Sequence, residues 1–283
     1  SRRVGAITRQ LRLTDASTGK TLAVLDAVQH DPAVKGANKA IVMPAAPLKK
    51  AGVRTYDPGY TNTVAVRSNI CYIDGEKGVL RYRGYPIEEL AEHSNYLDVA
   101  HLVVYGELPT ASESAEWSSS VLLHLSLPEG VERAIASLPA NAHPMSAIVV
   151  GLTSLGSFRP ESNPALSGNG VYQRRDVQDQ EIVRILGAGP AIAAAAYHLR
   201  TGRKLPRPKR GLSYAENLLF MLDSDGDVNY RPNPRLAKAL DVLFVLHAEH
   251  EMNCSTAACR HLSSSGVDVY TSVAGAVGAL YGP

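Results

Sequence analysis

The chain has 283 residues, of which 45% are hydrophobic and 20% charged, and this is ordinary usage for a soluble globular protein with a sizeable core. Its 29 basic residues nearly balance 27 acidic ones, so no overall charge favours nucleic acid or a membrane surface as a partner. The longest apolar stretches, such as residues 187–197, contain Pro or are rich in Gly and Ala, and none predicts a membrane span of about 20 residues. Three cysteines are too few for a disulfide scaffold, which favours a reducing compartment.

Strand signals are confined to the first part of the chain. Residues 10–26 predict a β-hairpin, in which strands at 11–14 and 21–25 flank a turn of small and polar residues. Residues 27–62 carry scattered Pro, Gly and Lys and predict an extended connection. Residues 70–85 predict two short strands around a glycine turn.

Helix signals dominate from Pro86 onward. Proline at a first helical position, a polar cap or a following glycine marks most of the boundaries. The predicted helices span residues 87–93, 97–105, 112–125, 145–158, 176–186, 191–199, 235–247 and 269–281. The sequence therefore predicts a mainly α fold, with a β-rich N-terminal segment at 1–85 and a helical domain at 86–283.

The helix predicted at 235–247 ends in a concentration of titratable side chains. Asn233 is its expected cap and Pro234 its first residue. His247 and His250 are three residues apart, so both imidazoles lie on one face if the helix continues past His247. The apolar positions that fit a largely buried helix are Leu236, Leu240, Leu243, Phe244 and Val245.

Three interpretations of the histidine pair stay open on the pattern alone. With Glu251 the pair offers metal ligands, although zinc hydrolases place their two histidines four apart around a Glu. The histidines also suit a packed helix end, where the helix dipole favours a protonated imidazole. The third interpretation is recognition of a small anionic or carbonyl substrate by hydrogen-bonding imidazoles, assisted by Asn253 and Ser255.

Other features carry weaker signals. Cys254 and Cys259 are five apart, which places them on poorly aligned faces of a helix and favours packing over a redox or metal role. The basic loop at 203–210 could attract the phosphates of a nucleotide-bearing cofactor, but the pattern favours a solvated loop. The Ala- and Gly-rich surface of the helix at 269–281 would let another helix approach closely, which suggests an interface.

Three separated motifs resemble the citrate synthase family. One is the run His247-Ala248-Glu249-His250-Glu251-Met252-Asn253, which is followed by residues 270–283. The second joins residues 72–76 to 80–91, and the third joins 217–223 to 232–236. The likeness covers nearly the whole chain. The form of the histidine motif is similar to the bacterial-type branch, which includes plant and algal peroxisomal enzymes.

The resemblance implies a helical, homodimeric enzyme that condenses acetyl-CoA with oxaloacetate to citrate and free CoA, as in the tricarboxylic acid and glyoxylate cycles. Acetyl-CoA is then a substrate, and no tightly bound cofactor, metal, nucleic acid or membrane is expected. In that family the second histidine of the pair hydrogen-bonds oxaloacetate, which carries over to His250, with His247 and Asn253 in the same site. A histidine donor aimed at the ketone polarises the carbon under attack. No residue is assigned to CoA.

The family's acid and base are not matched by residues of this chain. The acid that enolises acetyl-CoA is a histidine after Gly-Pro-Leu, and the chain ends at Gly282-Pro283. The later Gly-His-Arg motif, the Asp that removes the methyl proton and the arginines that bind the substrate carboxylates are absent too, so no catalytic residue is assigned. We therefore expect the 283 residues to be roughly the first two-thirds of a family member and inactive alone.

The branch implies a peroxisomal or glyoxysomal location, with the mitochondrion as the alternative. A rival hypothesis from another functional class is a non-catalytic dimerisation or interaction module that keeps the helical core of the family. A metal hydrolase built on His247 and His250 is the third hypothesis, and it ranks last.

Overall fold

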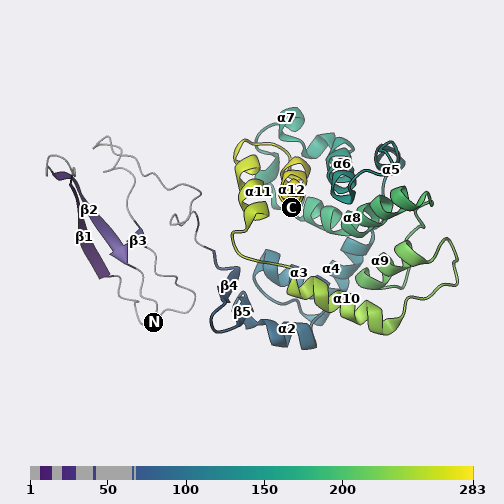
Figure 1. Ribbon diagram of the computed structural model, residues 1–283, viewed down its shortest axis with the longest axis horizontal. Helices are drawn as coiled ribbons and strands as arrows, with labels where there is room; N and C mark the ends of the chain where they lie inside the picture. The colour runs from purple at the N-terminus through teal and green to yellow at the C-terminus, as the bar shows by residue number, and fades with distance from the viewer. Residues whose placement is uncertain (1–6, 15–20, 30–40, 43–65, 67, 283) are drawn as a thin grey trace. The chain divides into compact units, whose positions relative to one another are not determined.

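The structure is a computed structural model that describes residues 7–14, 21–29, 41–42, 66 and 68–282 (Figure 1). The chain forms two compact units, Ser1–Asn69 and Ile70–Pro283.

The first unit contains a three-stranded antiparallel sheet. Strands β1 (Ile7–Thr14) and β2 (Thr21–Gln29) pair along their length, with Leu11 opposite Leu25, which confirms the hairpin predicted at 10–26. Strand β3 (Ile41–Val42) pairs with the end of β2, so the extended connection predicted at 27–62 is wrong at these strand positions. The predicted turn at 15–20 and the rest of that connection lie outside the described residues.

The second unit begins with the hairpin predicted at 70–85, which the structure confirms. Strands β4 (Cys71–Asp74) and β5 (Val79–Tyr82) are antiparallel, and β6 (Tyr85–Pro86) adds a short third strand. Gly78, with φ +63°, occupies the left-handed region that the turn requires. The hairpin therefore belongs to the same compact unit as the helices, whereas the predicted division at 85/86 placed it with the N-terminal segment.

Helices make up most of the second unit, which confirms the mainly α fold (Figure 1). They are α2 (Ile87–His93), α3 (Tyr96–Tyr105), α4 (Ala111–Leu122), α5 (Glu129–Ala136), α6 (Pro144–Ser157), α7 (Pro164–Ser167), α8 (Arg175–Thr201), α9 (Tyr214–Asp223), α10 (Pro234–Leu246), α11 (Cys254–Ser264) and α12 (Val269–Gly278), with short 3₁₀ turns at Pro160–Ser162 and Val171–Gln173. Helices α5, α7, α9 and α11 were not predicted from the sequence.

Local capping signals predicted several boundaries well. Asn233 accepts a hydrogen bond from the Arg235 amide at the start of α10, and His143 caps α6 ahead of Pro144. Helix α3 ends at Gly106. Helix α4 begins at Ala111, one residue before the predicted start, and Thr110 forms its capping box with Glu113.

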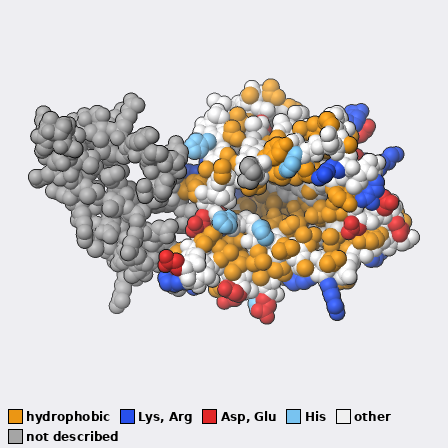
Figure 2. All heavy atoms as spheres, in the orientation of Figure 1, with side chains coloured by type: hydrophobic (Ala, Val, Ile, Leu, Met, Phe, Trp, Pro, Cys, Tyr) orange, Lys and Arg blue, Asp and Glu red, His pale blue; other side chains and the backbone are white. Residues whose placement is uncertain are grey.

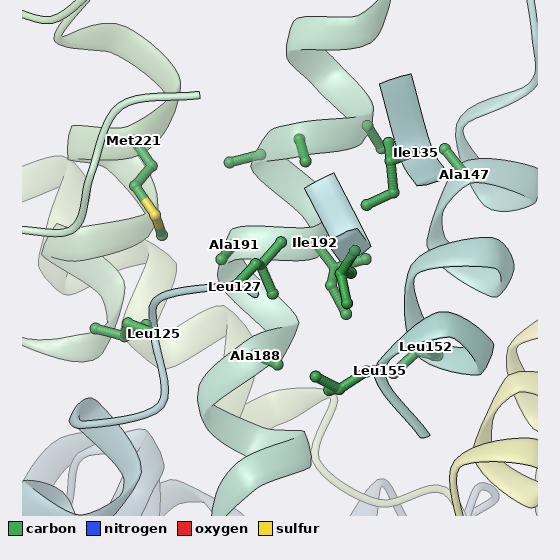
Figure 3. Close-up of a cluster of buried hydrophobic side chains, with 14 of the residues drawn as sticks. Leu125, Leu127, Ile135, Ala147, Leu152, Leu155, Ala188, Ala191, Ile192 and Met221 are labelled. Carbon is green, nitrogen blue, oxygen red and sulfur yellow. The ribbon is translucent and has the colours of Figure 1, made fainter. Parts of the chain in front are cut away.

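Helix α8 is the centre of the main core (Figure 3). Ile192 and Ala191 from α8 lie among Ile135 of α5 and Leu152 and Leu155 of α6, all at most 5% exposed. The helix runs for 27 residues, so the prediction of two helices separated at Pro190 is wrong. Proline costs an interior helix a hydrogen bond and about 3 kcal/mol, but α8 buries ten residues between its neighbours, and that burial outweighs the cost.

By length and composition α8 is also apolar enough to cross a membrane, with a mean hydropathy of 1.4 in its best window. The apolar stretch at 187–197 was not expected to span a membrane, because it contains Pro190 and is rich in Gly and Ala. Half of that window is buried inside the unit, so packing in the core accounts for its apolar composition.

A buried ionic cluster joins α8 to α12. Glu181 is 2% exposed and accepts a hydrogen bond from the Tyr270 hydroxyl. Its Oε1 lies 3.1 Å from Arg184 Nη1 and 3.5 Å from Arg159 Nη2. Burial, aided by the carboxylate, raises the pKa of Tyr270 far above its ordinary value, so the hydroxyl remains a donor. One carboxylate therefore holds three side chains from different parts of the unit.

Helix α12 uses its small residues for close packing within the chain. A β-carbon at Gly275 would lie 2.0 Å from Leu262 Cδ1 of α11, and Ala274 is 4% exposed. At Gly278 a β-carbon would meet nothing within 4 Å. Packing inside the unit therefore accounts for part of the small-residue surface that suggested an interface.

Helix α10 is much less buried than its apolar sequence predicted. Only Ala237 and Val245 are buried, while Leu236 is 60% and Leu243 50% exposed. The helix packs against α2, α3 and α9 and leaves the opposite side open, where hydrophobic side chains gather (Figure 2). An open apolar groove runs along it, lined by Pro234, Arg235, Lys238, Ala239, Val242 and Leu243.

Candidate functional site

The histidine motif lies in a loop between α10 and α11. Helix α10 ends at Leu246, and His247 has left the helical conformation with φ −105° and ψ 5°. Residues 247–253, called the histidine loop below, contain no helical turn before α11 begins at Cys254. The condition that would place both imidazoles on one helical face is therefore not met.

His247 is held against the end of α10. Its Nδ1 lies 2.7 Å from the Leu243 carbonyl oxygen, and its backbone amide donates to the same oxygen at 3.1 Å. Because a carbonyl only accepts, Nδ1 carries a proton, and Nε2 is the nitrogen that remains for a ligand. The side chain as a whole is exposed. Packing at the helix end thus accounts for Nδ1 of His247, and Nε2 remains available to a ligand.

His250 is also exposed. Among residues 66 and 68–282, no hydrogen bond or ion pair involves its imidazole. Both ring nitrogens are therefore available for a substrate, in contrast to His247. Glu251, the next residue, has an unusual backbone conformation with φ +56°, which turns the chain sharply after His250.

The β4–β5 hairpin supports the histidine loop, which passes beside it in Figure 1. The Tyr82 hydroxyl lies 3.1 Å from the carbonyl oxygen of Leu246, the last residue of α10, and 3.1 Å from that of Glu249 in the loop. The Ile73 amide donates to Glu251 Oε1 at 3.3 Å. Sequence reasoning did not connect these residues to the site, because Tyr82 is 164 and 167 positions away from its two partners.

Cys71 on β4 also interacts with the loop. Burial and a hydrogen bond to the Glu249 carboxylate raise the pKa of its thiol to about 12. The thiol is therefore protonated at neutral pH and is a poor nucleophile. Glu249 Oε2 also accepts from the Glu251 amide at 2.8 Å, so the carboxylate bridges the hairpin and the loop.

Asn253 closes the loop and caps α11. Its Oδ1 accepts from the Thr256 amide at 2.9 Å, which leaves the side-chain NH₂ to donate elsewhere. The Ser255 hydroxyl in the first turn of α11 is shielded from solvent and has no hydrogen-bond partner within the described part of the chain. Cys254 is exposed and Cys259 half-buried, both as free thiols.

The other candidates from the sequence lie apart from the loop. Within residues 68–282, no three His, Cys, Asp or Glu side chains are grouped to hold a metal ion. In the basic loop, Arg203 pairs with Asp225 at 3.5 Å and Arg207 with Glu132 at 2.5 Å. These ion pairs agree with a structured surface loop, and no residue is assigned to CoA.

Comparison with known proteins identifies the relatives of this chain. A family model described as citrate synthase, C-terminal domain, matches residues 59–283. The glyoxysomal citrate synthase of Cucurbita maxima is 51% identical over 96% of this chain, and the peroxisomal citrate synthase 1 of Arabidopsis thaliana is 49% identical over 99%. The peroxisomal citrate synthase of Dictyostelium discoideum is 52% identical over 82%.

Solved structures give the same result for the fold. Citrate synthase from Pyrobaculum aerophilum matches 80% of this chain with a TM-score of 0.73 and 31% identity, and the chain covers 55% of it. The Thermotoga maritima enzyme matches 81% with a TM-score of 0.67 and 30% identity, and 56% of it is covered. The chain spans about half the length of these proteins and of the plant relatives, 52% and 57%, which is less than the two-thirds expected.

Proposed function

The chain belongs to the citrate synthase family, and we propose that it forms the oxaloacetate-binding side of an enzyme that condenses oxaloacetate with acetyl-CoA to give citrate and CoA. About 50% identity to glyoxysomal and peroxisomal synthases supports the reaction. The observation that carries the proposal is the exposed, unengaged imidazole of His250 in a loop fixed on both sides.

His250 is the proposed contact to the ketone oxygen of oxaloacetate. A ring N–H donated to that oxygen withdraws electrons from the carbon under attack and stabilises the charge that develops on oxygen. The interaction strengthens as the carbonyl acquires alkoxide character, so it favours the transition state over bound substrate. An exposed imidazole can form this bond without first breaking one inside the protein.

His247 and Asn253 supply secondary contacts in this proposal. The Nε2 of His247 is left for a ligand because Nδ1 is bonded to the Leu243 carbonyl, and the Asn253 NH₂ can donate while Oδ1 caps α11. Two donors beside His250 would favour a substrate that carries two carboxylates.

Binding of oxaloacetate to the 283-residue chain tests the proposal. Titration followed by NMR is expected to shift the resonances of residues 247–253, and His250→Ala is expected to weaken binding about tenfold or more. His261→Ala is the matched control, because His261 is exposed and bonds its own helix as His247 does. An oxaloacetate titration that leaves the loop resonances unchanged, or equal binding by His250→Ala, would contradict the assignment.

Turnover by these 283 residues alone is expected to be negligible, since no residue here is assigned as acid, base or carboxylate clamp. A coupled assay that follows CoA release would check this, with the Cucurbita enzyme as the positive control. Release near the control rate would contradict the expectation and locate a full set of catalytic groups within the chain. Absence of both turnover and oxaloacetate binding would instead favour the dimerisation module.

A homodimer and a peroxisomal or glyoxysomal location complete the proposal, with the mitochondrion as the alternative. The location rests on the compartments in the names of the relatives. Light scattering of the purified chain should give twice its monomer mass. Imaging of the natural protein in its own cells should locate it in peroxisomes. A monomer, or a mitochondrial pattern, would contradict the respective part.

A further inference from the structure

One side chain, that of Tyr82, shares its single hydroxyl proton between two backbone carbonyls, the last of α10 and one in the histidine loop. The Tyr82 hydroxyl lies 3.1 Å from the carbonyl oxygen of Leu246 and 3.1 Å from that of Glu249. These are the residues immediately before His247 and His250. Because a peptide group is planar, fixing the carbonyl of one residue also fixes the amide of the next. A single hydroxyl therefore orients the backbone from which both imidazoles extend.

The hydroxyl is itself held in place by the core beneath it. Tyr82 is fully buried and packs with Leu90 of α2, Val99 and Leu102 of α3, and Val245 of α10. Burial raises the pKa of the Tyr82 hydroxyl, so it stays protonated and can donate throughout the neutral range. Its position is thus set by the packing of three helices, and the loop takes its position from the hydroxyl.

Neighbouring groups of the hairpin reinforce the same stretch. Cys71 is the register partner of Tyr82, so both side chains lie on the same face of the hairpin. That thiol bonds the Glu249 carboxylate, and the Ile73 amide bonds the Glu251 carboxylate at 3.3 Å. The residues on each side of His250 are therefore attached to β4, while the Tyr82 hydroxyl on β5 holds the intervening backbone.

We propose that Tyr82 is a positioning residue for oxaloacetate recognition, because its hydroxyl fixes the peptide groups that precede His247 and His250. The proposal rests on the proposed function through its assignment of His250 to oxaloacetate. Tyr82 does not touch the substrate. It acts by restricting the loop to the conformation in which His250 can donate, so that binding does not have to order the loop first.

Tyr82→Phe removes only the hydroxyl and keeps the buried ring. Tyr72→Phe is the matched control, because Tyr72 is on the paired strand but its hydroxyl contacts Asp74 instead of the loop. Hydrogen exchange of the Ala248 and Glu251 amides should accelerate about fivefold in Tyr82→Phe, and the oxaloacetate dissociation constant should rise by a similar factor. Both should be unchanged in Tyr72→Phe, and exchange in α8 should be unchanged in both variants.

The outcomes separate this proposal from the function on which it rests. Unchanged loop exchange in Tyr82→Phe overturns the proposal, and so does faster loop exchange with wild-type oxaloacetate affinity. If the wild-type chain does not bind oxaloacetate, both the proposed function and the positioning role of Tyr82 are overturned. If Tyr82→Phe accelerates exchange throughout α8, Glu251→Ala provides the second test. It removes the acceptor of the Ile73 amide outside the core, and it should weaken oxaloacetate binding about twofold, with an unchanged affinity counting against the proposal.

Discussion

Around α8, Ile192, Ala191 and Met221 are at most 1% exposed and are enclosed by neighbouring helices, whereas both imidazoles of the histidine loop are exposed. Close packing fixes the first region from every side. The loop is fixed instead by a few hydrogen bonds from one hairpin, led by Tyr82. Substitutions in the first region should therefore change the free energy of unfolding, while those in the second should change ligand binding with little effect on stability.

The largest stability effect is expected for Ile192→Ala. Ile192 is fully buried among α5 and α6, so truncation leaves a cavity and should lower the free energy of unfolding by about 2–5 kcal/mol. Leu236→Ala on α10 is the control, because Leu236 is 60% exposed and its loss should cost less than about 0.5 kcal/mol. Chemical denaturation measures both. Equal losses would break the comparison between buried and exposed apolar positions.

A second prediction compares two glycines on α8. A β-carbon at Gly187 would lie 2.3 Å from the Val121 carbonyl oxygen, so Gly187→Ala should destabilise by about 1–3 kcal/mol as α4 and α8 separate. At Gly189 the nearest atom, the Tyr214 hydroxyl, is 3.6 Å away. Gly189→Ala should therefore be neutral or stabilising by up to about 1 kcal/mol, through helix propensity. Thermal unfolding of both variants measures these effects. A Gly187→Ala protein as stable as wild type would show that α4 and α8 separate at little cost at the Val121 carbonyl.

The smallest effect concerns pH. Burial, with Arg184 and Arg159 nearby, lowers the pKa of His124 below its ordinary 6.5. Between the two pKa values the unfolded chain binds more protons than the folded chain, so stability is lost as the pH falls below about 6.5. In His124→Gln, the free energy of unfolding should fall less steeply as the pH is lowered from 6.5 towards 5. Parallel curves for the two proteins would contradict this.

Most of the helical framework could be predicted because its signals are local. Pro144 and Asn233 mark helix starts through a fixed φ and a side-chain acceptor, and Gly106 ends α3 at a positive φ. Helix α5 was missed although Val131 and Ile135 are buried at helical spacing, and that periodicity could have identified it. Helix α11 has no buried residue, so its apolar pattern is too weak to find it.

The candidate site was only partly predictable. The motif from His247 to Asn253 located the loop, since its residue types and order resemble those of one family. The exposure of Leu236 was not predictable, because it depends on which neighbours pack against α10. The apolar sequence of α10 does not show whether the face that carries Leu236 is covered by another element or open.

The sequence by itself determined the family, the two hairpins, several helix caps and the histidine motif, because each depends on short motifs of neighbouring residues. Only the tertiary structure decided that α8 continues through Pro190 and that Tyr82 holds the backbone before His247 and His250. Burial offsets the cost of proline only when neighbouring helices are in place. A hydrogen bond across more than 160 residues depends on how distant segments pack together, and no local pattern records that.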